Sequence, residues 1–128
     1  MASLLIVDDE ERVRNILSEQ FSEEYQCQTA HTADEALTLI ASQSFDVIIT
    51  DLLMPGMRGE DFIGILRTAQ PRTPVIVISG AANRSHAEGL IIKGVFDYLL
   101  KPFHLQDIVE KVERAMEYRR RLTQNSGV

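Results

Sequence analysis

The sequence predicts an α/β protein, a doubly wound domain in which a five-stranded parallel sheet carries helices on both faces. Two observations support this prediction. Five short segments, most of them apolar, are spaced along the chain, and each is followed by a segment with helical periodicity. A strand that is apolar throughout belongs in a sheet covered on both faces, and alternating strands and helices are typical of parallel sheets. We therefore expect a single (βα)5 domain.

The first two strand–helix pairs are predicted near the N-terminus. Residues 4–7 are all apolar, which predicts a buried strand, and residues 11–22 have the spacing of an amphipathic helix. Residues 26–30 form the least apolar strand, which we expect at an edge of the sheet. Thr32 and Glu35 have the spacing of a capping box that opens the second helix. The apolar residues that these two helices should bury are Val13, Ile16, Leu17, Phe21, Ala36, Leu37 and Ile40.

The third and fourth strands are predicted to end at polar residues. Residues 46–50 form a strand that stops at Asp51, and the helix after it covers residues 59–68. Residues 75–78 form the next strand, which stops at Ser79. The helix between these strands should turn Phe62, Ile63 and Leu66 inward.

The C-terminal part supplies the last two helices and the fifth strand. Residues 84–93 have helical length, but Gly89 within them costs about 1 kcal/mol relative to alanine, so this should be the least stable helix. Gly94 ends it, residues 95–100 form the fifth strand, and Pro102 separates that strand from a long last helix. The apolar positions of the last helix are Leu105, Ile108, Val109, Val112, Ala115 and Met116.

Composition and charge exclude several classes of protein. Hydrophobic residues make up 45% and charged residues 25% of the 128 residues, as in ordinary globular domains. The net charge of −6 argues against nucleic-acid binding by the domain as a whole, the basic residues 119–121 being the exception. The single cysteine, Cys27, forms no internal disulfide and is interpreted as a structural residue, which fits a reducing compartment.

Membrane insertion and secretion are not indicated either. No apolar run approaches the roughly 18–20 residues of a membrane span, and residues 1–3 lack the basic start of a signal peptide. We expect a cytoplasmic protein.

Five polar residues follow four different strands of the predicted sheet. They are Asp8, Asp9, Asp51, Ser79 and Lys101, and the carboxyl ends of parallel strands meet at one crevice where ligands bind. Three neighbouring carboxylates repel one another unless a pKa rises or a cation binds. Oxygen ligands without histidine or cysteine favour Mg²⁺, or Mn²⁺, over Zn²⁺. Lys101 suits a phosphate oxygen.

Each of these residues also has an ordinary structural explanation. Asp51 fits a turn or a cap, Ser79 fits a helix cap, and Lys101 fits a salt bridge to one of the acids. Their joint occurrence at four strand ends favours a functional site.

The sequence closely resembles the receiver domain of two-component response regulators. The resemblance covers residues 2–118 and lies in four segments in the family's order and spacing, residues 4–10, 51–57, 77–80 and 94–103. It implies a flavodoxin-like sheet with strand order 2-1-3-4-5, and Asp51 as the residue that accepts a phosphoryl group. The donor would be the phosphohistidine of a sensor histidine kinase or phosphotransfer protein, or acetyl phosphate.

The resemblance also implies the ligands of a magnesium ion. Asp9 and Asp51 would bind Mg²⁺ directly, Asp8 through water, and the backbone carbonyl of Leu53 would complete the protein ligands. Mg²⁺ and Lys101 would neutralise the phosphoryl oxygens, so that catalysis is mostly positioning and electrostatics. Such a chain catalyses its own phosphorylation and dephosphorylation but is not a turnover enzyme.

The same resemblance implies a conformational switch. Ser79 would move to bond the phosphoryl oxygen, and Tyr98 would turn inward into the space that Ser79 leaves. Leu53 and Ala81 stand two residues after Asp51 and Ser79, and neither side chain can orient an attacking water. We therefore predict slow self-dephosphorylation. Leu53 also distinguishes the chain from haloacid dehalogenase phosphatases, which use an aspartate there as a general acid.

The partner surfaces follow partly from the resemblance and partly from the fourth helix. Ile91 and Ile92 are adjacent, so a helix cannot turn both toward the core, and one of them is either exposed or covered by the next loop. We expect this helix, the fifth strand and the last helix to form the surface that phosphorylation remodels, for a homodimer or an output domain. The alternative function is a degenerate receiver that acts only as a docking module.

The end of the chain is predicted to lie outside the receiver domain. Residues 119–128 are a basic helix end, a favourable place for cations, followed by a disordered tail from Thr123. This segment is either a solvated helix end or the start of a linker toward an output domain.

Overall fold

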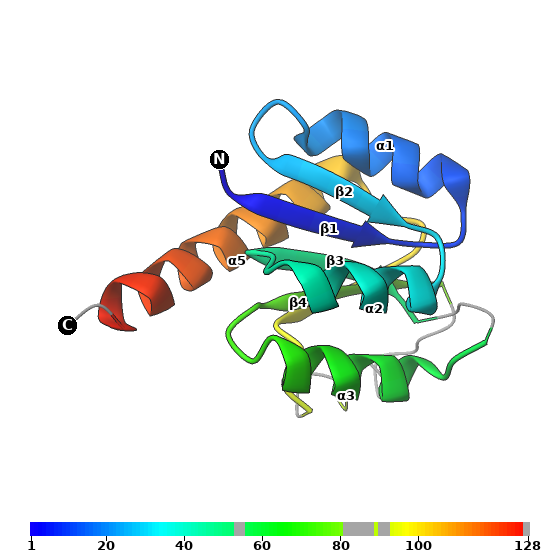
Figure 1. Ribbon diagram of the computed structural model, residues 1–128. Helices are drawn as coiled ribbons and strands as arrows, with labels where there is room; N and C mark the ends of the chain where they lie inside the picture. Colours follow the sequence, from blue (N-terminus) through cyan, green and yellow to red (C-terminus); the bar gives the residue numbers. More distant parts are fainter. Residues whose placement is uncertain (53–55, 81–88, 90–92, 127–128) are drawn as a thin grey trace.

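Five parallel strands form one sheet in the order β2-β1-β3-β4-β5, which confirms the predicted fold class and topology (Figure 1). The computed structural model describes residues 1–52, 56–80, 89 and 93–126. The strands are β1 Ser3–Val7, β2 Gln26–Ala30, β3 Val47–Asp51, β4 Val75–Ser79 and β5 Asp97–Leu100. The helices are α1 Glu11–Phe21, α2 Ala33–Ser42, α3 Gly59–Ala69 and α5 Leu105–Ser126.

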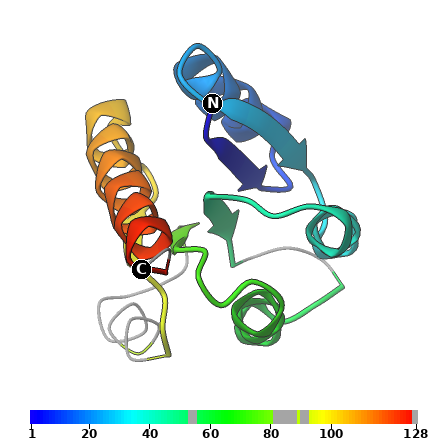
Figure 2. The ribbon, with the colours of Figure 1, turned by 60° about the vertical axis from the view of Figure 1, so that its left-hand side comes forward.

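The helices cover the two faces of the sheet in pairs, α1 with α5 and α2 with α3 (Figure 2). Strand residues alternate between the faces, since successive side chains of a strand point to opposite sides. In β1, Leu4 and Ile6 pack with α1 and α5, whereas Leu5 and Val7 pack with α2 and α3. All four are fully buried, and burying each such side chain contributes about 1.5–3 kcal/mol.

The helices bury most of the residues that periodicity predicted. Leu17, Phe21, Ala36 and Ile40 are buried, and so are the expected residues of α3 and the α5 residues Ile108, Val112 and Ala115. Ile16 and Leu105 were expected to be buried but are 38% and 40% exposed. Both residues lie at the border of their helix's apolar stripe, beside an open groove on the α1 and α5 side of the sheet.

Side-chain caps and turns fix the ends of several elements. The hydroxyl of Thr32 accepts the Glu35 N–H at 3.1 Å, as the capping box predicted. The Lys93 N–H donates to the Gly89 carbonyl at 3.2 Å. The next residue, Gly94, has a φ of +99°, a conformation that favours glycine. The other residues of the predicted helix over 84–93, including Ile91 and Ile92, lie outside the described residues.

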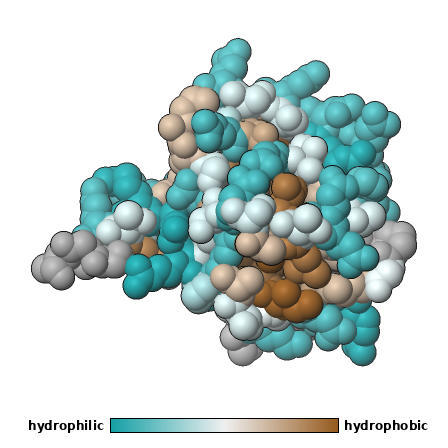
Figure 3. Space-filling view, in the orientation of Figure 1, coloured by the Kyte–Doolittle hydropathy of each residue, from teal (hydrophilic) through white to brown (hydrophobic). Residues whose placement is uncertain are grey.

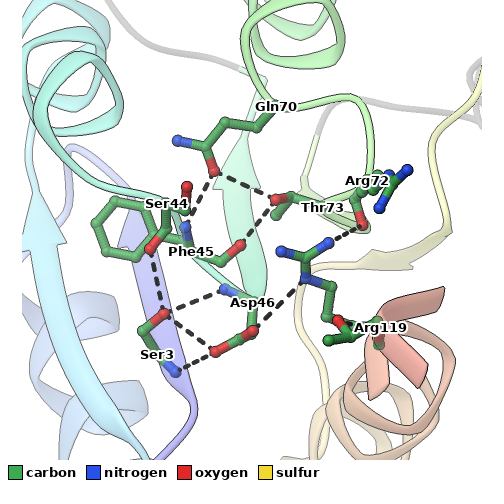
Figure 4. A network of polar contacts seen from close by, with 9 residues as sticks. Ser3, Ser44, Phe45, Asp46, Gln70, Arg72, Thr73 and Arg119 are labelled. Atoms are coloured by element: carbon green, nitrogen blue, oxygen red, sulfur yellow. Dashed lines mark hydrogen bonds and ion pairs between the residues drawn. The ribbon is translucent and has the colours of Figure 1, made fainter. Parts of the chain in front are cut away.

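A buried glutamine holds the amino end of the sheet together (Figure 4). The Oε1 atom of Gln70 accepts the Phe45 N–H at 3.0 Å, and its Nε2 donates to the carbonyls of Ile40 at 3.2 Å and Gln43 at 2.9 Å. The hydroxyl of Thr73 donates to the Phe45 carbonyl at 2.7 Å. The end of α3 is thereby joined to the α2–β3 connection, and the buried backbone groups there are satisfied.

The start of β3 is tied to β1 and to α5 by one aspartate. The Asp46 carboxylate accepts the Ser3 N–H at 2.8 Å and lies 3.5 Å from Arg119 Nε (Figure 4). Arg119 also donates to the Arg72 carbonyl at 3.4 Å. The sequence predicted Asp46 as the first residue of this strand, but β3 runs from Val47 to Asp51. The Asp46 side chain instead makes these contacts at the amino end of the sheet.

The disorder predicted from Thr123 is wrong as far as Ser126, because α5 continues to that residue and projects beyond the sheet (Figure 1). Bonds within the helix support this end. Glu117 pairs with Arg120 at 2.6 Å and with Arg121 at 3.1 Å, one helical turn away. The projecting end is mostly hydrophilic (Figure 3). Residues 127 and 128 lie outside the described part of the chain.

No helix among the described residues is long and apolar enough to span a bilayer. Cys27 lies half-buried in the edge strand β2, and burial raises the pKa of its thiol. A raised pKa keeps the thiol protonated, which agrees with the structural role predicted for this residue.

Candidate functional site

The ammonium group of Lys101 joins three carboxylates at the carboxyl end of the sheet. Its Nζ lies 2.8 Å from Asp51 Oδ2, 3.0 Å from Asp8 Oδ2 and 2.9 Å from Glu10 Oε1. The structure thus brings together residues from the ends of β1, β3 and β5, as the sequence predicted for Asp8, Asp51 and Lys101. The contact with Glu10 was not predicted.

The parallel register explains why these residues meet. Val7 is the Cα partner of Thr50, and Asp51 is the partner of Ile78, so β1, β3 and β4 end at one edge of the sheet. β5 ends there too, because Ser79 is the Cα partner of Leu100. Asp8 and Lys101, which follow β1 and β5, therefore meet Asp51, the last residue of β3, in the same crevice.

Hydrogen bonds to neighbouring residues hold Asp8 in this crevice. Its side chain is fully buried, and its Oδ1 accepts the Glu10 N–H at 2.9 Å. Its own N–H donates to the Ala30 carbonyl at 3.1 Å, and Arg14 donates to its carbonyl at 2.7 Å. These bonds leave Oδ2 directed at Lys101.

Asp51 and Lys101 are positioned by the ends of their strands. Asp51 is the last residue of β3 and is 3% exposed. The Thr50 hydroxyl donates to its carbonyl at 2.9 Å. The Lys101 N–H donates to the Ser79 carbonyl at 3.0 Å, so the pairing of β5 with β4 extends one residue past β5.

The charges of the site perturb two titrating groups. Burial raises the pKa of Asp8, although the Glu10 N–H and Lys101 oppose that rise, and the nearby charge of Asp51 adds to it. Burial alone would lower the pKa of Lys101, but its hydrogen bonds to Asp51, Glu10 and Asp8 together outweigh burial and raise it. Lys101 is therefore a cation at every physiological pH.

The carboxylates of the site fit a hard divalent cation. One oxygen each from Asp8, Asp9, Glu10 and Asp51 lies within 4.8 Å of the others. Asp8 and Asp51 are buried, whereas Asp9 and Glu10 are exposed. This set contains only oxygen donors, some of them open to water, which suits Mg²⁺ because that ion keeps several of its waters. The backbone carbonyl predicted as a further ligand belongs to Leu53, which lies outside the described residues.

The two residues predicted to act as a switch lie on neighbouring strands. Ser79 is the last residue of β4, is almost fully buried, and directly follows Ile78, the Cα partner of Asp51. Tyr98 is half-buried in β5 and packs against the core on the α2 and α3 side of the sheet. Ala81, predicted to leave water without a partner, lies outside the described residues.

Glu10 is the site residue that sequence reasoning missed. It lies in the segment of residues 4–10 that carries the family resemblance, but no role was predicted for it, and it is the N-cap residue of α1. Its side chain makes no cap bond and reaches Lys101 instead. The signal that could have found it is its position as the third acidic residue in succession after β1, next to Asp8 and Asp9, which were predicted to lie in the crevice.

Comparison with known proteins gives a consistent result. A family model described as the response regulator receiver domain matches residues 4–113. The hydrogenase transcriptional regulatory protein HoxA of Cupriavidus necator is 35% identical over 117 residues, which are 91% of this chain and 24% of that protein. The regulatory protein AtoC of Escherichia coli is 36% identical over 115 residues, 89% of this chain and 25% of that protein. The chain thus spans about a quarter of the length of these curated relatives.

Solved structures show the same similarity. A response regulator receiver domain protein from Clostridium thermocellum superposes with a TM-score of 0.88 at 27% identity, over 95% of this chain and 99% of that one. The response regulator TrrA of Thermotoga maritima, solved in complex with Mg²⁺ and BeF, superposes with a TM-score of 0.78 at 30% identity, over 90% of this chain and 99% of that one.

Proposed function

Because this chain belongs to the response regulator receiver domain family, we propose that it accepts a phosphoryl group on Asp51. The observation that carries the proposal is the position of Lys101. Its ammonium lies 2.8 Å from Asp51 Oδ2, beside the acidic group at the carboxyl end of the sheet. A carboxylate that is held next to a fixed cation in a partly water-excluded crevice is suited to phosphoryl transfer, which depends mainly on positioning and electrostatics.

The proposed reaction is a transfer between two covalent carriers. A carboxylate oxygen of Asp51 forms a bond to phosphorus, and the bond between phosphorus and the imidazole nitrogen of a phosphohistidine breaks. The electron pair of that bond returns to the imidazole, and Asp51 becomes an acyl phosphate. Lys101 donates to a phosphoryl oxygen and offsets its negative charge. Acetyl phosphate would react in the same way, with acetate leaving.

The metal ligands proposed for this step are Asp9 and Asp51 directly, Asp8 through water, and the backbone carbonyl of Leu53. The oxygen donors of Asp8, Asp9 and Asp51 lie close enough together to share one ion. When bound, Mg²⁺ or Mn²⁺ would supply positive charge that offsets both the carboxylates and the phosphoryl oxygens. Asp8 would contribute a buried carboxylate that is already paired with Lys101.

The proposed output is a change at the strand ends. Ser79 would donate its hydroxyl to the phosphoryl oxygen, and Tyr98 would turn inward behind it. The half-buried position of Tyr98 at the core supports this proposal, since only a modest rotation separates a core contact from solvent. Leu53 and Ala81 cannot orient water, so we expect a phosphorylated state that lasts longer than seconds. Loss of the phosphoryl group within seconds, in purified protein without a phosphatase, would contradict this expectation.

The proposed partners are a phosphodonor and a regulated module. The donor is a sensor histidine kinase or a phosphotransfer protein in the cytoplasm. HoxA is a transcriptional regulatory protein about four times as long as the matched segment, which supports a linked output domain for this chain. The projecting end of α5 would lead toward it (Figure 1). A homodimer through the fourth helix, β5 and α5 is proposed as the alternative partner contact.

Phosphorylation by acetyl phosphate tests the proposed function directly. The purified chain is incubated with acetyl phosphate and Mg²⁺, and phosphorylation is measured by intact mass and by phosphate-affinity electrophoresis. We expect one added phosphoryl group, which EDTA prevents and Asp51→Asn abolishes. Asp61→Asn is the matched control, because Asp61 is an exposed acid of α3, and it should react like the unmodified chain. A chain that is folded but never phosphorylated would instead be a docking module.

A further inference from the structure

Lys101 has no N–H donor left for a phosphoryl oxygen. An ammonium group carries three N–H donors and no acceptor. In the structure, three carboxylates lie within hydrogen-bond distance of Nζ, those of Asp51, Glu10 and Asp8. Lys101 must therefore release one of these partners before it can bond a phosphoryl oxygen.

The three partners differ in how deeply they are buried. The side chain of Asp8 is fully buried and that of Asp51 is 5% exposed, whereas that of Glu10 is 58% exposed. A buried carboxylate that loses its cation keeps an uncompensated charge away from water. An exposed carboxylate is rehydrated when it loses its partner, so that the loss costs little. Glu10 is the partner that Lys101 releases most easily.

The backbone at Glu10 permits this release without disturbing the site. The Glu10 N–H stays bonded to Asp8 Oδ1 at 2.9 Å, whichever way the Glu10 side chain points. The Glu10 side chain makes no cap bond to α1. Its departure from Lys101 therefore breaks one exposed ion pair and leaves the position of Asp8 unchanged.

We propose that Glu10 is the resting-state partner of Lys101, which the incoming phosphoryl group displaces. Glu10 is a positioning residue for the phosphorylation of Asp51, and this role rests on the proposed function. In the unphosphorylated chain it holds the ammonium group at the mouth of the crevice. As the phosphodonor enters, before the bond between Asp51 and phosphorus forms, Lys101 keeps Asp8 and Asp51 and exchanges Glu10 for a phosphoryl oxygen. The Glu10 ion pair therefore opposes the reaction by the free energy of one exposed contact.

Three variants separate this role from simpler effects of charge. Glu10→Ala removes the ion pair. Glu10→Asp keeps the charge at the mouth but shortens the side chain by one methylene, about 1.5 Å, so that it no longer reaches Lys101. Glu11→Ala is the matched control, because Glu11 is the adjacent acid, is exposed, and is not among the three partners of Lys101.

The first measurement is the rate of phosphorylation at subsaturating acetyl phosphate with saturating Mg²⁺, followed by quenching and phosphate-affinity electrophoresis. We expect Glu10→Ala and Glu10→Asp to react about two- to fivefold faster than the unmodified chain, the range of one exposed ion pair, and Glu11→Ala to react at the same rate. Equal rates in the unmodified chain and Glu10→Ala would overturn the proposal. A fast Glu10→Ala with a slow Glu10→Asp would also overturn it, since charge alone would then explain the effect.

The second measurement is Mg²⁺ affinity without a phosphodonor, by calorimetry. Glu10 belongs to the group of acids that fits a cation, so a metal role must be distinguished from the pairing role. We expect Glu10→Asp to bind Mg²⁺ within about twofold of the unmodified chain, whereas loss of a metal contact typically costs about 10–100-fold. A tenfold loss would identify Glu10 as a cation contact and overturn the proposal. Failure of the unmodified chain to be phosphorylated would instead overturn the proposed function itself, and the role of Glu10 with it.

Discussion

Replacing Lys101 with methionine tests the ion pairs at the centre of the site. The substitution keeps the apolar stem of the side chain and removes the ammonium, so that Asp8 and Asp51 lose their cation. Removing one partner of a buried pair costs about 3–5 kcal/mol. The Lys101 side chain is 16% exposed, which places the effect at the lower end. We expect the free energy of unfolding to fall by about 3 kcal/mol at pH 7 in EDTA.

Urea unfolding followed by far-UV circular dichroism measures this loss. With an m-value of about 2 kcal/mol/M, the midpoint should fall by about 1.5 M while m stays the same. Lys111→Met is the matched control, because Lys111 pairs with Asp97 at 3.0 Å but both side chains are about a fifth exposed. That variant should lose about 1 kcal/mol or less. If the two variants lose equal stability, or if Lys101→Met loses less than about 0.5 kcal/mol, burial does not strengthen the pairs as argued.

The pH dependence gives an independent check with a definite sign. The pKa of Lys101 is raised in the folded chain, so its pairs contribute fully below the ordinary value of 10.5 and are lost as pH rises through the folded pKa. The unmodified chain should therefore lose stability above pH 10.5 more steeply than Lys101→Met. On the acid side, burial raises the pKa of Asp8, and a protonated Asp8 needs no cation. The difference between the two proteins should shrink as pH falls toward about 4. A difference that is constant with pH would refute the electrostatic explanation.

Two further predictions concern local structure, and thermal and urea unfolding measure both. Gly94→Ala should destabilise the fold by about 1–2 kcal/mol, because φ is +99° there. Its matched control is Gly64→Ala, which should stabilise the fold by up to about 1 kcal/mol, because Gly64 is exposed inside α3 and an added Cβ meets nothing within 4 Å. Equal effects of the two substitutions would contradict the conformational argument. Thr32→Ala should cost about 1 kcal/mol through the lost α2 cap. Thr38→Ala, which removes an exposed hydroxyl bonded within α2, should cost less, and the reverse order would refute the capping argument.

Much of the fold could be predicted because each strand is a short apolar run. β1 and β4 begin and end within one residue of the prediction, since continuous apolarity is required where both faces are covered. The boundary of β3 moved by one residue because the Asp46 side chain contacts the Ser3 N–H and Arg119, both distant in sequence. β5 is shorter than predicted, Asp97–Leu100, because its pairing with β4 begins at Asp97, and Val95 is buried in the core ahead of the paired strand.

Most members of the candidate site were predictable, and so was a salt bridge between Lys101 and one of the acids, but the contact with Glu10 was not. Asp8, Asp51 and Lys101 were found because parallel strands must bring their ends to one crevice. The partnership of Glu10 with Lys101 depends on the rotamers of two long side chains, which no pattern in the sequence specifies. The contact of Arg119 with Asp46 joins residues far apart along the chain and likewise carries no local signal. The tail from Thr123 was predicted to be disordered, yet α5 continues to Ser126. The Glu117 ion pairs with Arg120 and Arg121 lie just before this stretch, and their contribution could not be judged from composition alone.

The glutamine at the amino end of the sheet restricts the length of a surface loop. Connections on protein surfaces usually tolerate insertions. Gln70 bonds the carbonyls of Ile40 and Gln43 and the N–H of Phe45, so the spacing of three backbone groups is matched to one side chain. One added residue between positions 43 and 45 would separate these groups and leave a buried amide without partners. We expect this connection to have a fixed number of residues in any functional variant of the domain, although it lies at the opposite end of the sheet from Asp51.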